Sequence, residues 1–243
     1  MSEVKANYDS VIKLTTWTKI TKIFTEPAVV FENLRVYPDW IIPVLLTLLV
    51  GLSTVYLTVD IQKKTQQEFI LNSEQIPEEQ KDEILEGLED QSFARTVVVP
   101  AAGLVFWVFA SYAVAALAFM AFGNFIYGGK ATFVQNFALY SWAGLIGVLE
   151  GLIKLPLFIS KGTFEVYTSL AILLDPGESK TLMFKIFNAV DIFSIWKIIV
   201  WSIGFSVIYK FSKGKSYTAI IILFLIYTVI SISISQMFGG FGN

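Results

Sequence analysis

The residues of this chain best suited to chemistry are four ionisable side chains that fall inside long apolar stretches. They are Glu150, Lys154, Asp191 and Lys197. An ionisable side chain within a membrane span costs a few kcal/mol, so it usually faces the protein interior, a cavity or the interface. Such a group can line the pathway of a transporter or ion conduit. It can equally pair with an opposite charge and hold helices together.

The spacing of these four residues predicts which of them pair. Glu150 and Lys154 lie four positions apart and share one face of a helix, where they can form an ion pair. Asp191 and Lys197 lie six positions apart and are turned roughly 120° from each other, so we do not expect them to pair. Matching their depths in antiparallel spans predicts a contact between Lys154 and Asp191. It likewise predicts a contact between Glu150 and Lys197.

A simpler interpretation of the same residues needs no functional site. Asp191 can cap the start of a helix, where a carboxylate favours the free N–H groups. Lys154 and Lys197 can extend their stems so that the charged ends reach the interface. We expect this structural role rather than a buried functional site.

The composition excludes most familiar catalytic chemistry. Cysteine and histidine are both absent, which rules out disulfides, thiolate or imidazole metal sites and histidine-based mechanisms. A paired-carboxylate mechanism needs two carboxylates that share a proton, and Glu150 is expected to bind a lysine instead. Phosphate-binding glycine loops in their strand-to-helix context are absent. We therefore expect no enzyme, with no catalytic residues, no cofactor and no metal.

The elements that position the four charges are membrane helices. Hydrophobic residues make up 55% of the 243 residues and charged residues only 16%, whereas soluble domains average about a quarter charged. The net charge is −2, and no nucleic-acid motif is present, so we expect no nucleic-acid partner. The fold class expected is an all-α polytopic membrane helix bundle whose main partner is the lipid bilayer.

Five apolar blocks are long enough to cross about 30 Å of hydrocarbon. Together they form a transmembrane domain over residues 39–243, after an N-terminal arm over residues 1–38. The arm is expected to carry one interfacial helix that begins near Pro27, with an apolar face at helical spacing. The expected spans are at about residues 40–59, 96–122, 133–158, 189–209 and 217–237.

The segment 60–95 between the first two spans is the most polar part of the chain. Pro77 opens an acidic run in which Ile84, Leu85 and Leu88 form a narrow apolar stripe. We expect an acidic helical hairpin outside the membrane. A solvated acidic face is the simpler interpretation, and docking of a partner protein is the alternative.

Small residues recur along the third expected span. Ala143, Gly147 and Gly151 repeat every four positions, a pattern that allows two helices to cross closely. Packing inside the monomer is favoured over a homo-oligomer, because a five-helix bundle needs such faces internally.

Lysine placement predicts the orientation. Lys210, Lys213 and Lys215 crowd the short loop between the fourth and fifth spans, where the preference of positive residues for the inner side is strongest. Lys130 falls on the same side. We therefore expect the N terminus inside the cell and the C terminus outside.

Several motifs, taken in order, resemble the bacterial branch of the Yip domain family. The resemblance runs from Ile20 to the C terminus and includes the five-span layout. The motifs are Phe24-Thr25-Glu26-Pro27 and Pro38-Asp39-Trp40 before the first span, Gly128-Gly129-Lys130-Ala131-Thr132-Phe133 before the third, and Asp191-Ile192-Phe193-Ser194-Ile195-Trp196 at the fourth.

This resemblance implies an integral protein of the bacterial cytoplasmic (inner) membrane. Eukaryotic relatives are associated with Rab GTPases, vesicle trafficking and membrane shaping, and some bacterial relatives accompany ABC-type exporters. We therefore expect a non-enzymatic protein that acts by interaction, either as an accessory subunit of an ABC-type export system or as a membrane-organising factor. The alternative is a small transporter or ion conduit that uses the four charges. The acidic segment 60–95 is not a feature of the core family.

Overall fold

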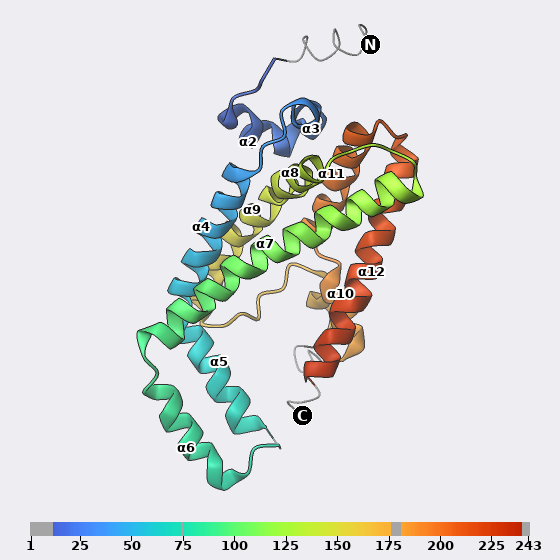
Figure 1. Ribbon diagram of the computed structural model, residues 1–243. Helices are drawn as coiled ribbons and strands as arrows, with labels where there is room; N and C mark the ends of the chain where they lie inside the picture. Colours follow the sequence, from blue (N-terminus) through green and yellow to red (C-terminus); the bar gives the residue numbers. More distant parts are fainter. Residues whose placement is uncertain (1–11, 74, 176–180, 240–243) are drawn as a thin grey trace, which may run out of the picture. The chain divides into compact units, whose positions relative to one another are not determined.

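The computed structural model describes residues 12–73, 75–175 and 181–239, with the backbone alone for 235–239. Over these ranges the regular elements are helices, and an isolated bridge joins Ser169 to Asp191. The all-α prediction is therefore confirmed (Figure 1). The longer helices are α2 (Thr16–Thr25), α3 (Pro27–Val36), α4 (Ile41–Leu57), α5 (Val59–Asn72), α6 (Glu78–Glu89), α7 (Val99–Met120), α8 (Phe133–Ala143), α9 (Leu145–Lys161), α10 (Leu182–Ala189), α11 (Ile192–Tyr209) and α12 (Lys213–Gly239).

Three short elements complete the helical structure. The π-helical turns η1 (Ala94–Val98) and η2 (Ala121–Ile126) extend α7 at its two ends, and a 3-10 turn η3 (Leu170–Leu173) lies between α9 and α10. Four helical segments in the described ranges are long and apolar enough to cross a membrane, when α8 and α9, which meet at Gly144, are counted as one. They are Ala94–Ile126, Phe133–Lys161, Ile192–Tyr209 and Lys213–Ile234.

A fifth span depends on the bent pair of α4 and α5. The two helices meet at Thr58 with an angle of 61° and satisfy the same criteria only when they are taken together. The Thr58 hydroxyl donates to the Thr54 carbonyl at 2.7 Å, a back-bond that often bends helices. The predicted first span thus continues directly into the polar segment through a bend.

The chain divides into two compact units. Within the described ranges, unit 1 comprises residues 12–48, 107–149 and 193–225. Unit 2 comprises residues 49–73, 75–106, 150–175, 181–192 and 226–239.

The N-terminal part of unit 1 contains two helices where the sequence predicted one. Pro27 occupies the first position of α3, where its missing N–H costs nothing. Figure 1 shows α2 and α3 at one end of the unit beside α8, and α3 contacts α8. Val30, Phe31 and Leu34 are fully buried. The apolar face that was expected at the lipid interface is therefore part of the protein core.

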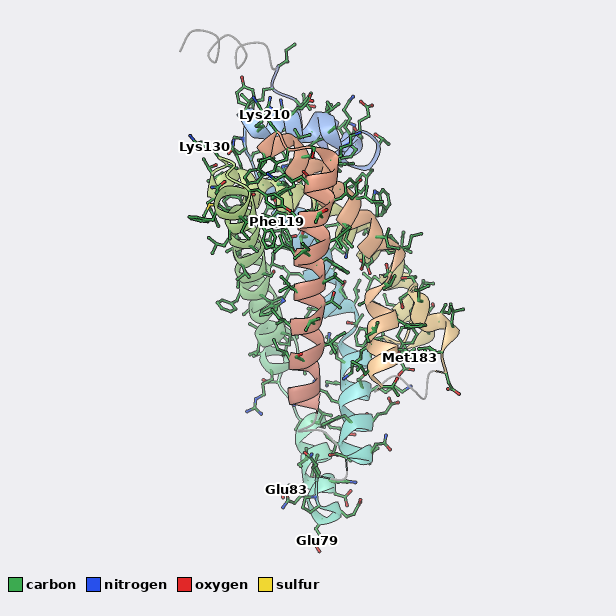
Figure 2. All side chains as sticks on the ribbon, turned by 90° about the vertical axis from the view of Figure 1, so that its right-hand side faces the viewer. Glu79, Glu83, Phe119, Lys130, Met183 and Lys210 are labelled. Carbon is green, nitrogen blue, oxygen red and sulfur yellow. The ribbon has the colours of Figure 1, made fainter. Side chains whose placement is uncertain are left out.

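Aromatic rings fill the rest of the unit 1 core. Tyr140 stacks on Trp201 with 5.1 Å between ring centroids. Phe119, labelled in Figure 2, packs edge-on against both rings and against Phe205. Each such pair contributes about 0.5–1.5 kcal/mol beyond area burial. Trp40, which directly precedes α4, packs edge-on against Phe137 with 5.3 Å between ring centroids.

Unit 2 contains the predicted helical hairpin. Helices α5 and α6 lie side by side (Figure 1) and bury Ile61, Ile70 and Leu88. Lys81 is buried as well, and its ammonium donates to the Leu71 carbonyl at 2.9 Å and to Glu78 at 2.6 Å. Residues 60–95 are therefore mostly a folded helical pair, and their position outside the membrane stays a prediction.

Candidate functional site

The charged cluster of unit 2 is built on α9 and on the residue that precedes α11. The Lys154 ammonium donates to Glu150 Oε1 at 2.6 Å and to Asp191 Oδ2 at 3.4 Å. The three side chains are largely buried, with 17%, 21% and 8% of the Lys154, Glu150 and Asp191 side chains exposed. The contact between Lys154 and Asp191 that depth matching predicts is present, as is the pair four positions apart on α9.

Asp191 is positioned by a short segment that the sequence did not single out. The Thr168 hydroxyl donates a short hydrogen bond to Asp191 Oδ2. The Leu170 amide donates to the Val190 carbonyl at 3.1 Å, and Ser169 Oγ donates to Asn188 Oδ1 at 2.8 Å. These bonds align the segment before η3 with the segment before α11, so the carboxylate stands opposite Lys154.

This arrangement suits structural work better than proton transfer. One ammonium serves two carboxylates, and a hydroxyl group binds one of them. A buried ion pair with additional hydrogen bonds compensates the cost of taking its charges out of water. The contacts therefore tie α9 to the segment between η3 and α11 within unit 2.

Tyr167 lies next to this cluster in the sequence and outside the spanning segments. Its ring packs edge-on against Phe184 with 5.0 Å between centroids. Burial and the neighbouring Glu165 carboxylate raise the pKa of the Tyr167 phenol above its ordinary value, with burial as the larger cause. The phenol therefore stays protonated at neutral pH.

Lys197 is the fourth residue of the predicted cluster. It is half-buried on the part of α11 that belongs to unit 1. A pair between Glu150 and Lys197 would join the two units, so that pairing stays a prediction.

The three small residues of the third span have different surroundings. Ala143 is fully buried in the unit 1 core. A Cβ atom added at Gly147 would meet no atom within 4 Å, whereas one added at Gly151 would lie 3.0 Å from Val50 Cγ1 in unit 2. A close approach is thus made at Gly151, and the use of all three residues as one packing stripe stays a prediction.

The sequence analysis missed an ion pair in unit 1 between a buried lysine and an aspartate whose side chain is 40% exposed. Lys19 is 1% exposed and donates a short bond to Asp39 Oδ2. Trp142 Nε1 donates to the Asp39 carbonyl at 2.8 Å and to Asp39 Oδ1 at 3.0 Å. The Lys19 ammonium also lies 5.5 Å from the centroid of the Trp142 ring, within the range of a cation–π interaction.

These contacts connect three parts of unit 1: α2, the segment that precedes α4, and α8 itself. Because Lys19 has almost no exposure, removal of Asp39 would leave a buried cation without its counter-charge. In the sequence, Lys19 is one of several lysines in a polar arm, and its position relative to the neighbouring apolar residues does not indicate burial. Asp39 entered the sequence analysis only as part of the Pro38-Asp39-Trp40 motif before the first span.

Metal binding finds no support among the described residues. No group of three or more histidine, cysteine, aspartate or glutamate side chains in those ranges could hold a metal ion.

Comparison with known proteins places the chain in a family. The family model described as the Yip1 domain matches residues 21–235, which is most of the chain. No curated protein and no solved structure matches the chain. The matched range includes the helices α3 to α11 and the cluster of Glu150, Lys154 and Asp191, whereas Lys19 lies just before it. The chain therefore belongs to the Yip1 domain family.

Proposed function

We propose that this protein acts in the membrane by interaction and not by catalysis, as an accessory subunit of a transport assembly such as an ABC-type exporter. The observation that carries the proposal is the folded hairpin of α5 and α6, which exposes both carboxylates and apolar side chains. The membrane setting itself rests on the apolar helices and on the Yip1 domain.

The hairpin has the surface of a protein-binding element. Phe69 and Leu71 on α5 are 52% and 54% exposed, and Ile84 on α6 is 39% exposed. A merely solvated acidic helix needs no exposed aromatic ring, whereas protein interfaces combine an apolar centre with a polar rim. Figure 2 shows Glu79 and Glu83 at the tip of the hairpin. Besides Glu78, which pairs with Lys81, the exposed carboxylates of α6 and its C-terminal cap are Glu79, Asp82, Glu83, Glu86, Glu89 and Asp90.

The expected partner surface is therefore cationic with an apolar centre. Opposite potentials across an interface raise the association rate and exclude wrong partners more than they raise affinity. We further propose that the chain lies in the bacterial cytoplasmic membrane with its N terminus inside, its C terminus outside and the hairpin on the outer side. The lysine-rich junction of α11 and α12, residues 210–215, supports this orientation.

Crosslinking and mild-detergent purification of the full chain from native membranes, followed by mass spectrometry, tests the proposal. Recovery of an exporter ATPase, permease or adaptor in fixed proportion would support it. A chain that lacks residues 62–91 should lose the partner, and so should a variant with the six α6 carboxylates changed to amides. Glu32→Gln removes an exposed carboxylate of unit 1 and is the matched control.

Unchanged recovery of every co-purifying protein after the deletion would contradict docking at the hairpin. Recovery of the chain with lipid alone would favour a membrane-organising role.

An ion conduit is the second candidate, and the ionisable groups of α9 favour it. Glu150 and Lys154 lie within a segment long and apolar enough to span the membrane. Their ion pair reduces the charge that a pathway would use. Proton or cation flux in vesicles that is present with the intact chain and lost in Glu150→Gln would favour the conduit over the accessory role.

A further inference from the structure

We propose that one end of unit 1 binds the headgroups of anionic phospholipids. This basic end consists of two loop regions and carries four exposed lysines. The loop regions are residues 127–131 and residues 210–215, the second of which includes the first turn of α12. The lysines are Lys130, Lys210, Lys213 and Lys215. Figure 2 shows Lys130 and Lys210 at the same end of the unit.

The two loops pack tightly on one another. A Cβ atom added at Gly129 would lie 2.5 Å from Tyr209 Cδ1 and 2.7 Å from Phe211 Cζ, so only glycine fits there. The rings of Tyr127 and Phe211 meet edge-on with 5.7 Å between centroids. Asn124 closes the first loop by bonding both the amide and the carbonyl of Ala131. The lysines are thus attached to a fixed backbone.

Lys215 is held in place although its side chain is exposed. Its ammonium lies 4.4 Å from the ring centroid of Tyr127 and 4.4 Å from that of Phe211. It also donates to the Tyr127 carbonyl at 3.3 Å. Cation–π contacts of this kind restrict the side chain and leave room for further hydrogen bonds. A held ammonium loses less conformational entropy when it binds a phosphate.

Lys210 occupies a backbone position that favours glycine. Its φ is 57°, and among described residues other than glycine it alone has a positive φ. The Phe211 amide donates to the Ser206 carbonyl at 3.1 Å, which is the Schellman arrangement at the end of α11. Glycine would adopt this conformation at lower cost. The helix dipole favours a cation there, and the lysine adds a charge to the basic end.

The four lysines form no ion pair with any residue in the described ranges. The acidic residues that unit 1 contributes within those ranges are Glu26, Glu32 and Asp39. Glu26 pairs with Lys22, and Asp39 pairs with Lys19. The positive charge of the basic end therefore remains available to an external anion.

The position of the loops favours lipid over other anions. Residues 127–131 follow the span that ends at Ile126. Residues 210–212 join α11 to α12, and Lys213 and Lys215 lie in the first turn of α12. Phe125 and Ile126 are 81% and 61% exposed directly before the first loop. Apolar side chains that contact acyl chains thus adjoin lysines and aromatic rings at headgroup level. Clusters of cations beside a span attract acidic lipids in this way.

Native mass spectrometry of the full chain, titrated with phosphatidylglycerol or with phosphatidylcholine, tests the inference. We expect tighter binding of phosphatidylglycerol and a loss on the order of fivefold in affinity for each lysine removed. The main variant combines Lys130→Gln, Lys210→Gly, Lys213→Gln and Lys215→Gln. The matched control changes four lysines of unit 2 to glutamine: Lys63, Lys64, Lys161 and Lys185.

Single variants keep the test decisive if the fourfold variant fails to fold. Lys210→Gly should fold at least as well as the natural chain while it loses phosphatidylglycerol affinity. Lys215→Arg should retain that affinity because it keeps the charge and the ring contacts. Equal affinity of the natural chain, the Lys210→Gly variant and the unit 2 control for phosphatidylglycerol would overturn the inference. Displacement of the lipid by an equal concentration of inorganic phosphate would show a free-anion site and would also overturn it.

Discussion

Unit 1 and unit 2 differ in how they bury their side chains. The largest fully buried side chains of the described ranges, among them Trp142, Phe31 and Phe205, all belong to unit 1. Unit 2 buries fewer apolar side chains, among them Ile61 and Leu88 in the hairpin and Phe184 in α10. Burial of apolar surface contributes about 25 cal/mol per Å². Unit 1 thus has a protein core of its own, whereas unit 2 relies more on its surroundings, which in a membrane are lipid or a partner.

The two units also differ in charge. The ends of unit 1 carry many lysines and few carboxylates, and the α5–α6 hairpin of unit 2 carries mainly carboxylates. All six tryptophans lie in unit 1, so their fluorescence reports on that unit alone. The difference between the two units can therefore be tested by measuring the unfolding of each unit separately, with tryptophan fluorescence for unit 1.

The largest effect is expected from Asp39→Asn in unit 1. The change leaves the buried Lys19 cation without its counter-charge and should lower the free energy of unfolding by about 3 kcal/mol. Tryptophan fluorescence during denaturation in detergent measures it. Lys22→Gln, which removes a more exposed ion pair with Glu26, is the control and should cost less than about 1 kcal/mol. Equal decreases in the free energy of unfolding for Asp39→Asn and Lys22→Gln would mean that the core does not depend on the pair of Lys19 and Asp39.

Lys154→Met tests the corresponding pair in unit 2. Loss of the ammonium between Glu150 and Asp191 should destabilise this part of the unit by about 2–3 kcal/mol. Faster hydrogen exchange of residues 150–175, with tryptophan fluorescence unchanged, is the expected result. Lys154→Arg retains the charge and should exchange at nearly the natural rate. An equal decrease in the free energy of unfolding measured by tryptophan fluorescence would show that the two units unfold together.

Two glycine substitutions sharpen the contrast in packing. A Cβ atom at Gly123 in unit 1 would overlap the Tyr209 ring, whereas one at Gly87 in α6 would meet no atom within 4 Å. Gly123→Ala should cost about 1–3 kcal/mol because the core cannot absorb the methyl group. Gly87→Ala should stabilise the hairpin by about 0.5–1 kcal/mol, because alanine favours helix. Thermal unfolding followed by circular dichroism compares both with the natural chain, and a stabilising Gly123→Ala would contradict the tight core.

The smallest effect concerns Tyr167 in unit 2. Its phenol should ionise above the ordinary value near pH 10, because burial and the Glu165 carboxylate raise its pKa. The raised pKa in the folded state means a small stabilisation that is present below pH 10 and lost as the pH rises through the folded value. Ultraviolet titration of the natural chain against Tyr167→Phe measures this phenol, and Glu165→Gln should shift it back toward 10. An unchanged titration in Glu165→Gln would contradict the carboxylate's contribution.

Hydropathy predicted most of the fold because long apolar runs have few alternatives in a membrane. The segments 94–126, 133–161, 192–209 and 213–234 lie close to the predicted spans. Local breaks were missed. The third span divides at Gly144 into α8 and α9, and the N-terminal arm divides at Glu26 into two helices. Such breaks depend on one or two residues that leave the apolar pattern intact.

The candidate sites were predictable to the extent that their residues are close in sequence or equal in depth. Glu150 and Lys154 share a helix face, and Asp191 has the matching depth. Asp39 is 20 positions from Lys19 and 103 from the Trp142 side chain that binds it. No spacing rule connects residues so far apart, and a lysine in a polar segment gives no indication of burial.

The hairpin has a thermodynamic consequence for any partner that binds it. Lys81 and the buried side chains between α5 and α6 hold the hairpin in its helical form before binding. Binding of a partner therefore does not include the free-energy cost of ordering a flexible chain, which disordered segments incur when they fold on binding. Binding should then show a small unfavourable entropy and a small change in heat capacity. Differences in affinity among partners should lie mainly in how slowly they dissociate.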